Sequence, residues 1–188
     1  MILSREEGIL FYKLYPALMC YTNQKLKVVG EMASDLEQYL AVAGEQRLKV
    51  RDALEAHQEL IDGFIAENPV NLAPDELAIV SDWKSAVVGN FFIFRYLKQY
   101  TIFLDDRSPP RAYGVIAIAD PIQDLVGLGL PILTKAVLLP FKGKIIYDGL
   151  LSSYRVSFGA GVRKRLQETY KRAKEIDGII TSLPLMKE

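Results

Sequence analysis

The residues around position 160 could bind an anion. Gly159 and Gly161 form a Gly-x-Gly pattern, and three cations follow it directly: Arg163, Lys164 and Arg165. A predicted strand leads into this pattern and a predicted helix follows it, so the cations would occupy the first helical turn and oppose the helix dipole. An anion held by the free N–H groups of the helix start and by these cations would offset that cost. We therefore predict an anion-binding site formed by these five residues.

A helix start without any ligand explains the same residues. In that interpretation the cations are solvated, and Lys164 pairs with Glu168 one turn later along the helix. The pattern lacks the second glycine and the Lys-Ser/Thr of a P-loop, and it lacks the third glycine of a dinucleotide-binding fingerprint. The sequence alone leaves both interpretations open.

Two aspartates are the candidates for acid–base chemistry. Asp120 and Asp148 each follow a predicted strand beside apolar residues, where burial would raise the pKa of a carboxyl group. Each also precedes a residue that is typical of turns, Pro121 or Gly149, and aspartate in such dipeptides is ordinary turn chemistry. The two aspartates support an alternative function, a carboxylate-based hydrolase or transferase that could use a divalent metal.

The chain contains one cysteine and one histidine, Cys20 and His57, which are the sole candidates for a thiol–imidazole pair. Both lie on apolar stripes of predicted helices, so we interpret them as packed side chains. His57 is in register with Leu54 and Ile61, which predicts that it lies on the inward or boundary face of its helix and binds no metal. We expect neither a cofactor nor a metal site.

Aromatic side chains cluster where the second half of the chain begins, and they could stack on nucleic-acid bases. They are Phe91, Phe92, Phe94, Tyr96, Tyr100 and Phe103. Successive side chains of a strand point to opposite faces, so at most half of these rings could be displayed together. We favour packing in the core of a rolled sheet, because aromatic residues are common in strands.

Periodic apolar residues predict that residues 5–84 are mainly helical. Capping-box patterns begin helices after Ser4 and after Ser34, and Pro16 should kink or split the first of these helices. A single helix is expected over residues 46–68. Pro74 should open another helix, which runs to about residue 84.

Short runs of aromatic and β-branched residues replace this pattern from Gly89 onward. They predict strands at residues 91–97, 100–104, 113–119, 133–139, 144–147 and 153–158. Hairpin turns are expected at residues 141–143 and at Asp148-Gly149, and a helical turn is expected after an N-cap at Asp120. A last helix near residues 161–176 completes the pattern. Its apolar stripe comprises Val162, Leu166, Tyr170, Ala173 and Ile176.

The predicted fold class is therefore α+β. An N-terminal helical segment precedes a small antiparallel β-barrel or rolled sheet, and a C-terminal helix follows. The helical region is expected over residues 1–86 and the β-domain over residues 87–188, although the two could form one compact unit.

The 188 residues carry no net charge, but charge is divided unevenly along the chain. Residues 1–134 contain 12 Lys and Arg against 18 Asp and Glu, whereas residues 135–188 contain 11 against 5. Such polarity suits docking of the acidic part on the basic part, self-association, or an anionic partner for the basic end. No secretory signal or membrane-spanning run is evident, so we expect a soluble cytoplasmic protein with no membrane partner.

The stretch from Leu138 to Leu150 reads LLPFKGKIIYDGL, with Phe158-Gly159 downstream and residues 11–14 (FYKL) near the start. With these motifs the chain resembles a family of uncharacterised bacterial proteins. The resemblance covers most of the chain and implies a bacterial cytoplasmic protein. It implies no activity, cofactor or catalytic residue.

Recognisable catalytic chemistry is missing from the sequence, so we expect a non-enzymatic binding or regulatory module. Its basic C-terminal face would contact an anionic partner, either a nucleic acid or an acidic protein surface. The carboxylate-based enzyme that uses Asp120 and Asp148 is the alternative.

Overall fold

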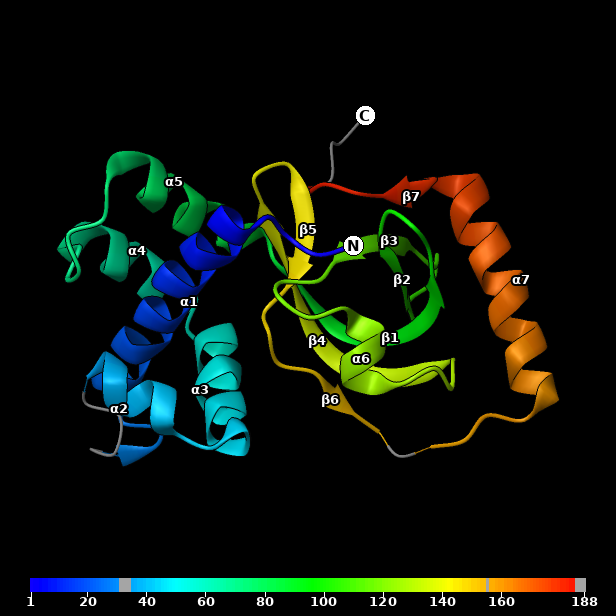
Figure 1. Cartoon of the computed structure of the whole chain (residues 1–188), viewed down its shortest axis with the longest axis horizontal. Helices are drawn as coiled ribbons and strands as arrows, with labels where there is room; N and C mark the ends of the chain where they lie inside the picture. The colour runs from blue at the N-terminus through cyan, green and yellow to red at the C-terminus, as the bar shows by residue number, and fades with distance from the viewer. Residues whose placement is uncertain (31–34, 155, 185–188) are drawn as a thin grey trace. The chain divides into compact units, whose positions relative to one another are not determined.

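The computed structural model describes residues 1–30, 35–154 and 156–184 (Figure 1). The chain divides into two compact units. Residues 6–84 make up the helical unit, and residues 1–5 and 85–188 make up the sheet unit. The chain mixes helices and strands and has an N-terminal and a C-terminal helix, as the α+β prediction requires.

The helical unit is built from helices whose apolar residues repeat every three or four positions. The helices are α1 (Arg5–Leu26), α2 (Leu36–Ala41), α3 (Gly44–Ala56), α4 (Glu59–Glu67) and α5 (Pro74–Asp82), and a 3₁₀ turn (Trp83–Ser85) follows them. α5 begins at Pro74 as predicted, because proline fits the first helical turn and Asp75 and Glu76 suit the positive end of the dipole. The buried core includes Phe11, Leu14, Leu18, Val50, Phe64 and Trp83.

α1 runs through Pro16 without a break, so the expected split is wrong. Pro16 is buried, and so is every other residue from 14 to 23, including Cys20. This packing on all sides of the helix offsets the hydrogen bond that proline cannot donate.

α2 begins after Asp35, whose carboxylate accepts a hydrogen bond from the Gln38 backbone N–H at 2.8 Å. This bond satisfies one of the free donors of the helix start. Ser34, the cap expected from the sequence, lies outside the described residues.

The single helix expected over residues 46–68 is two helices, α3 and α4, which are separated at His57 and Gln58. His57 is the C-cap of α3, and its side chain is 49% exposed, with Nδ1 3.0 Å from Glu59 Oε1. The inward or boundary position expected for His57 is therefore wrong. Leu54 and Ile61 are both buried on either side of the break, so the apolar spacing continues across it and conceals it in the sequence.

The sheet unit contains short strands joined mostly by tight connections. The strands are β1 (Val87–Tyr96), β2 (Thr101–Asp105), β3 (Ala112–Ile116), β4 (Ile132–Phe141), β5 (Lys144–Tyr147), β6 (Ser152–Ser153) and β7 (Ile179–Ile180). α6 (Ile122–Val126) follows β3, and α7 (Ala160–Ile176) lies between β6 and β7 in the chain.

The strands pair in the order β1-β2-β3-β5-β4-β6, and β1 also pairs with β4, so five of them form a ring of pairings. Most pairs are antiparallel as expected, but β3 runs parallel to both β5 and β7. The chain leaves β3 through α6, returns along β4 and turns into β5, which therefore points in the same direction as β3. The expectation of a purely antiparallel sheet is wrong in these two pairs.

The predicted β4–β5 hairpin is confirmed. Lys142 and Gly143 form its two-residue turn with φ values of 49° and 75°. Positive φ at both positions is what a type I′ turn requires, and its twist matches that of the flanking strands.

The second expected hairpin, at Asp148-Gly149, is wrong because β6 pairs with β4 rather than with β5. β6 also ends at Ser153, whereas the sequence predicts a strand through residue 158. Tyr154 and Val156 are exposed, so their alternation does not mark a buried face. Arg155, which belongs to the same predicted strand, lies outside the described residues.

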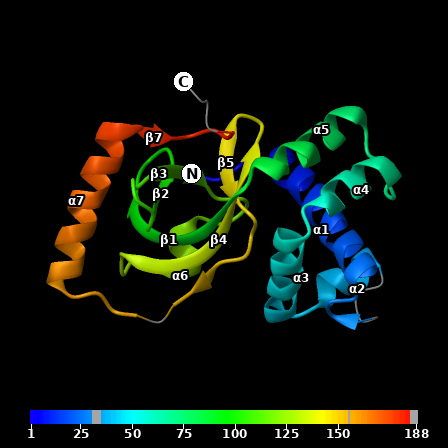
Figure 2. The ribbon, with the colours of Figure 1, turned by 180° about the vertical axis from the view of Figure 1, so that it is seen from behind.

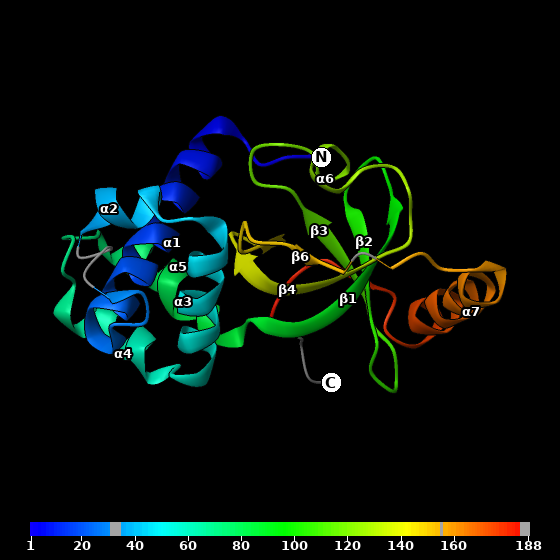
Figure 3. The same ribbon diagram turned by 90° about the horizontal axis from the view of Figure 1, so that it is seen from below.

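α7 lies along one face of strands β1–β3 (Figures 1 and 2), whereas α6 lies on another side of these strands (Figure 3). The apolar stripe of α7 is confirmed except at Ile176, which is 48% exposed. Leu166, Tyr170 and Ala173 join Ile102, Leu104 and Ala112 in one buried cluster. This cluster fixes the rotation of α7 about its own axis, and therefore decides which polar residues of the helix face the neighbouring loop.

Candidate anion-binding pocket

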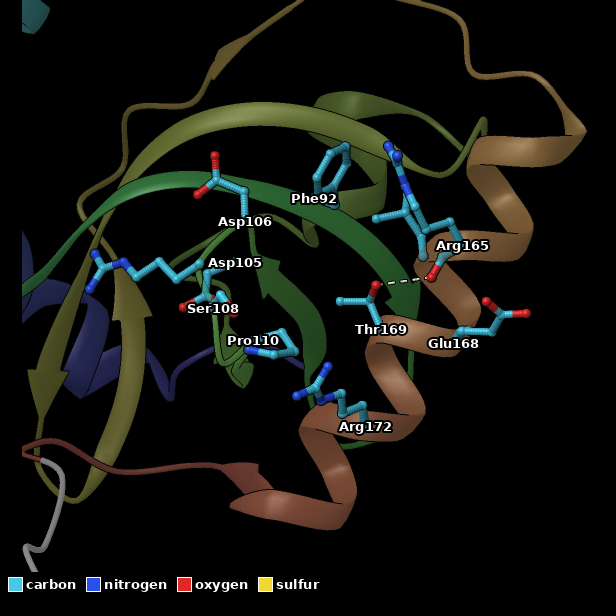
Figure 4. Close-up of a pocket in the computed structure, with 11 residues that line it drawn as sticks. Phe92, Asp105, Asp106, Ser108, Pro110, Arg165, Glu168, Thr169 and Arg172 are labelled. Carbon is cyan, nitrogen blue, oxygen red and sulfur yellow. Dashed lines mark hydrogen bonds between the residues drawn. The ribbon is translucent and has the colours of Figure 1, made fainter.

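A cavity of about 500 Å³ lies between α7 and the loop that joins β2 to β3 (Figure 4). The last residue of β2, Asp105, lines the cavity together with Asp106, Arg107, Ser108 and Pro110 of the loop. The helix contributes Arg165, Leu166, Glu168, Thr169 and Arg172, and β1 contributes Phe92. The cavity belongs entirely to the sheet unit.

Helical spacing explains why Arg165, Thr169 and Arg172 line the cavity together. Residues four and seven positions apart fall within one row of a helix, because each residue turns the chain by about 100°. The buried stripe that contains Leu166 lies beside this row and packs against the strands. The row is therefore held at the edge of the contact between helix and sheet, where it faces the loop.

Arg165 and Arg172 are exposed, and neither side chain has a hydrogen bond or an ion pair within the described residues. In Figure 4 the Arg172 guanidinium turns towards Pro110, whereas the Glu168 carboxylate turns away from the loop. Arg107 differs from both, because its Nη2 donates a hydrogen bond of 2.8 Å to the Val88 carbonyl. Two guanidinium groups at this cavity are thus available to an anion.

Asp105 closes the loop that forms the opposite wall. Its backbone N–H donates to the Arg111 carbonyl at 3.1 Å, and its Oδ1 accepts from the Arg111 backbone N–H at 2.8 Å. The side chain is buried, and Oδ2 has no hydrogen-bond partner within the described residues. Burial raises the pKa of Asp105, although the Arg111 N–H and the charge of Arg107 act in the opposite direction.

The five residues of the predicted anion site lie around the start of α7. Gly159 is the N-cap with extended φ and ψ of −71° and 172°, and open space surrounds both Gly159 and Gly161. Arg163, Lys164 and Arg165 are exposed but point in different directions, since they are consecutive on a helix.

Among the three cations, Arg165 alone lines the cavity. The Arg163 Nε donates to the Phe158 carbonyl at 3.0 Å. No ion pair joins Lys164 to Glu168 in the described part of the chain, so the pairing expected for a ligand-free helix start is not formed.

Sequence reasoning missed Arg172, Thr169 and the residues of the loop. The spacing of Arg165 and Arg172, seven positions apart beside a buried stripe, is a signal that could have found the helical wall. No local signal joins α7 to a loop some 60 residues earlier in the chain.

The aromatic run divides between the two faces of the sheet, and along β1 Phe91 and Phe92 lie on opposite faces, as strand alternation predicts. Phe91 is fully buried against Phe103 and Tyr113, with ring centroids 6.1 and 5.8 Å away. Phe92, Phe94 and Tyr100 are partly buried on the opposite face, where they pack against the α7 cluster. Of these, Phe92 also lines the cavity.

The two candidate aspartates follow neighbouring parallel strands but differ in exposure. Asp148 comes directly after β5, is buried, and accepts a hydrogen bond from the Leu150 backbone N–H at 3.2 Å. Asp120 follows β3 and is exposed, and the N-cap of α6 is Pro121, so the capping role expected for Asp120 is wrong. No group of three His, Cys, Asp or Glu side chains in the described residues could hold a metal ion.

None of the helices described here is both long enough and apolar enough to cross a membrane. Comparison of the chain with protein-family models, curated proteins and solved structures finds no match. The resemblance to uncharacterised bacterial proteins therefore stays a prediction.

Proposed function

We propose that the protein is a non-enzymatic binding module that contacts a nucleic acid through the basic surface of α7. The observation that carries this proposal is the pair of guanidinium groups at the edge of the cavity, Arg165 and Arg172, which have no partner within the described residues. Guanidinium groups keep their charge at all physiological pH values and match phosphate oxygens with two parallel hydrogen bonds. A nucleic-acid backbone supplies such oxygens along its whole length.

The rest of the exposed surface of α7 also carries positive charge, which supports an anionic partner. Its exposed cations are Arg163, Lys164, Arg165, Lys171, Arg172 and Lys174. At the helix start, Gly159 and Gly161 leave the backbone N–H groups open to an anion, which the helix dipole would favour. Contacts of this kind are sequence-independent and supply most of the affinity of non-specific nucleic-acid binding.

A nucleic acid fits the cavity better than an acidic protein does because of Phe92. An aromatic ring beside cationic groups can stack on a nucleic-acid base. Acidic side chains contain no base that could stack on the ring. An acidic protein surface would use the cations and leave the ring without a role.

Titration of the chain with an unrelated RNA and an unrelated DNA at two salt concentrations tests the proposal. We expect binding to both that weakens steeply with salt, because phosphate contacts release counterions. Replacing Arg163, Lys164 and Arg165 together by Ala should weaken binding to both nucleic acids equally and flatten the salt dependence.

The matched control removes three lysines from the helical unit, Lys13, Lys25 and Lys84, each of which forms an ion pair with a carboxylate. This variant should bind as the parent does. Absence of binding by the parent at low salt overturns the proposal, and binding to polyglutamate in its place would identify an acidic protein as the partner.

The carboxylate-based alternative is supported by one feature of the topology. β3 and β5 are parallel neighbours, and Asp120 and Asp148 follow their carboxyl ends. Calorimetric titration with Mg²⁺ and Mn²⁺ tests a metal-dependent version, which requires saturable binding that is lost when both aspartates become asparagine. Identical metal-binding curves for the parent and the variant would contradict the metal-dependent alternative.

A further inference from the structure

The cavity beside α7 has three chemically different walls, formed by an aromatic ring, by cations and by a carboxylate. Phe92 comes from β1, Arg165 and Arg172 come from α7, and Asp106 comes from the loop after β2 (Figure 4). A ligand that satisfies all three must combine a flat surface, anionic groups and hydrogen-bond donors. A nucleotide chain has each of these.

The Phe92 ring is held in place and is still accessible from the cavity. It packs edge-on against Phe158, with ring centroids 5.6 Å apart and an interplanar angle of 68°, and it contacts the cluster beneath α7. The side chain is nevertheless only partly buried, and it lines the cavity. A fixed ring of this kind offers a stacking surface to any base, because every base has a π face.

The two arginines are too far apart along the helix to serve the same phosphate group well. They lie seven positions apart, which corresponds to about 10 Å along the helix axis. In Figure 4 their guanidinium groups lie towards opposite ends of the cavity. They therefore suit two separate anionic groups along a chain, as successive phosphates of a nucleic-acid strand are.

Asp106 decides which way such a strand would lie. Its carboxylate is exposed on the loop wall and has no partner within the described residues. It repels phosphate and accepts hydrogen bonds from amino or hydroxyl groups. Arg107 on the same wall donates to the Val88 carbonyl, and the Glu168 carboxylate of α7 turns away from the loop. The α7 side with Arg165 and Arg172 is therefore the favourable side for phosphates. The sugar or the polar edge of a base would then face the loop.

We propose that this cavity binds single-stranded nucleic acid, with one base stacked on Phe92 and neighbouring phosphates on Arg165 and Arg172. The inference rests on the proposed function and names the form of the partner. A base in a duplex is paired and stacked on both sides, so it could enter the cavity only after leaving the helix. Single-stranded RNA and DNA share the required chemistry.

Fluorescence anisotropy of the full chain with labelled oligonucleotides tests the inference. The probes are a 12-mer of uridine, a 12-mer of thymidine and a DNA duplex with a 12-base-pair mixed sequence. At low salt we expect both single strands to bind at least about tenfold more tightly than the duplex. Equal affinity for duplex and single strands overturns the inference and leaves the proposed function standing.

Two matched pairs of variants assign the binding to the cavity. R165A/R172A removes the two arginines that line the cavity, and K164A/K171A removes the same charge from the adjacent exposed row of the helix. We expect the arginine variant to lower the salt slope for the single strands by about 1.4, which is 0.7 for each lost phosphate contact. Equal effects of the two variants would show binding by the whole basic surface, and this result contradicts the inference alone.

The second pair separates ring stacking from packing. F92L keeps apolar volume but removes the π surface, and it should weaken single-strand binding by about 5- to 150-fold while leaving duplex binding unchanged. F92Y keeps the ring and should bind as the parent does. Parent-like single-strand binding by F92L would overturn the stacking role, and failure of the parent to bind any probe would overturn the proposed function as well.

Discussion

Four cations of the helical unit form ion pairs, namely Lys13, Lys25, Arg51 and Lys84, whereas no cation of α7 forms one within the described residues. In the helical unit Lys13 lies 2.6 Å from Glu76 and Lys25 lies 2.7 Å from Glu67. On α7, Lys164, Arg165, Lys171 and Arg172 have no ion pair within the described residues. Exposed ion pairs add little stability, so their presence does not explain the fold. Their absence from one basic helix indicates charge that is available to a ligand.

Of the changes that test this difference between the two units, charge reversal at the cavity should have the largest effect, which is on nucleic-acid binding. R165E/R172E replaces with anions two cations that have no ion pair in the described part of the chain, so nucleic-acid binding at low salt should fall by about 100-fold or more. K13E/K25E makes the same change in charge at paired positions, and we expect it to lower the melting temperature while binding changes far less. Anisotropy titration and thermal unfolding of the parent and the two variants measure both results. Equal loss of binding in both variants would show that net charge, and not the position of the cations, controls binding.

The two units also shift the pKa of particular carboxyl groups in opposite directions. In the helical unit the Lys25 ammonium and the Tyr21 hydroxyl lower the pKa of Glu67, and the Lys13 ammonium lowers that of Glu76. In the sheet unit burial raises the pKa of Asp105. The folded chain therefore holds the Asp105 proton to higher pH than the unfolded chain does. Stability from this group is present below about pH 4 and is lost as pH rises through the folded-state pKa.

Asp105→Asn should remove the loss of stability that accompanies ionisation of Asp105. Asparagine carries no charge and keeps an oxygen that can accept a hydrogen bond from the Arg111 N–H. We expect the variant to exceed the parent in melting temperature at pH 7, with the difference shrinking towards pH 4. Thermal unfolding across this range measures it. A variant that is less stable at pH 7 would show that Arg107 and Arg111 stabilise the ionised carboxylate more than burial destabilises it.

The smallest expected effect concerns the exposed pair of Lys25 and Glu67. Lys25 also lies over the Tyr21 ring, with Nζ 4.9 Å from the ring centroid. Lys25→Met keeps the aliphatic contact and removes the charge, so we expect a small fall in melting temperature at low salt that disappears at high salt. The fall should also disappear in acid, because the lowered pKa of Glu67 stabilises the fold only while the carboxylate is ionised. A salt-independent fall would indicate packing as the cause.

Local signals predicted several elements correctly. The Lys142-Gly143 turn needs positive φ at two positions, and Pro74 suits a first helical turn, so neighbouring residues are sufficient to specify both features. The stripe of α7 was found because its spacing matches one face of a helix. The break at His57 was missed because the apolar register continues across it. Of the kink or split expected at Pro16, the split does not occur, because burial on all sides offsets a lost hydrogen bond.

The sequence by itself determined the mixture of helices and strands, the position of the α7 stripe and the basic character of that helix. These properties depend on residues within one or two turns of each other, where propensity and periodicity act. Only the tertiary structure decided that β3 and β5 are parallel, that Phe92 faces α7, and that Arg165 and Arg172 line a cavity with Asp106. Packing of Leu166 and Tyr170 on the strands sets the rotation of α7, and Asp105 closes the loop opposite it. Contacts between such distant segments depend on the burial of both at once, which no local pattern encodes.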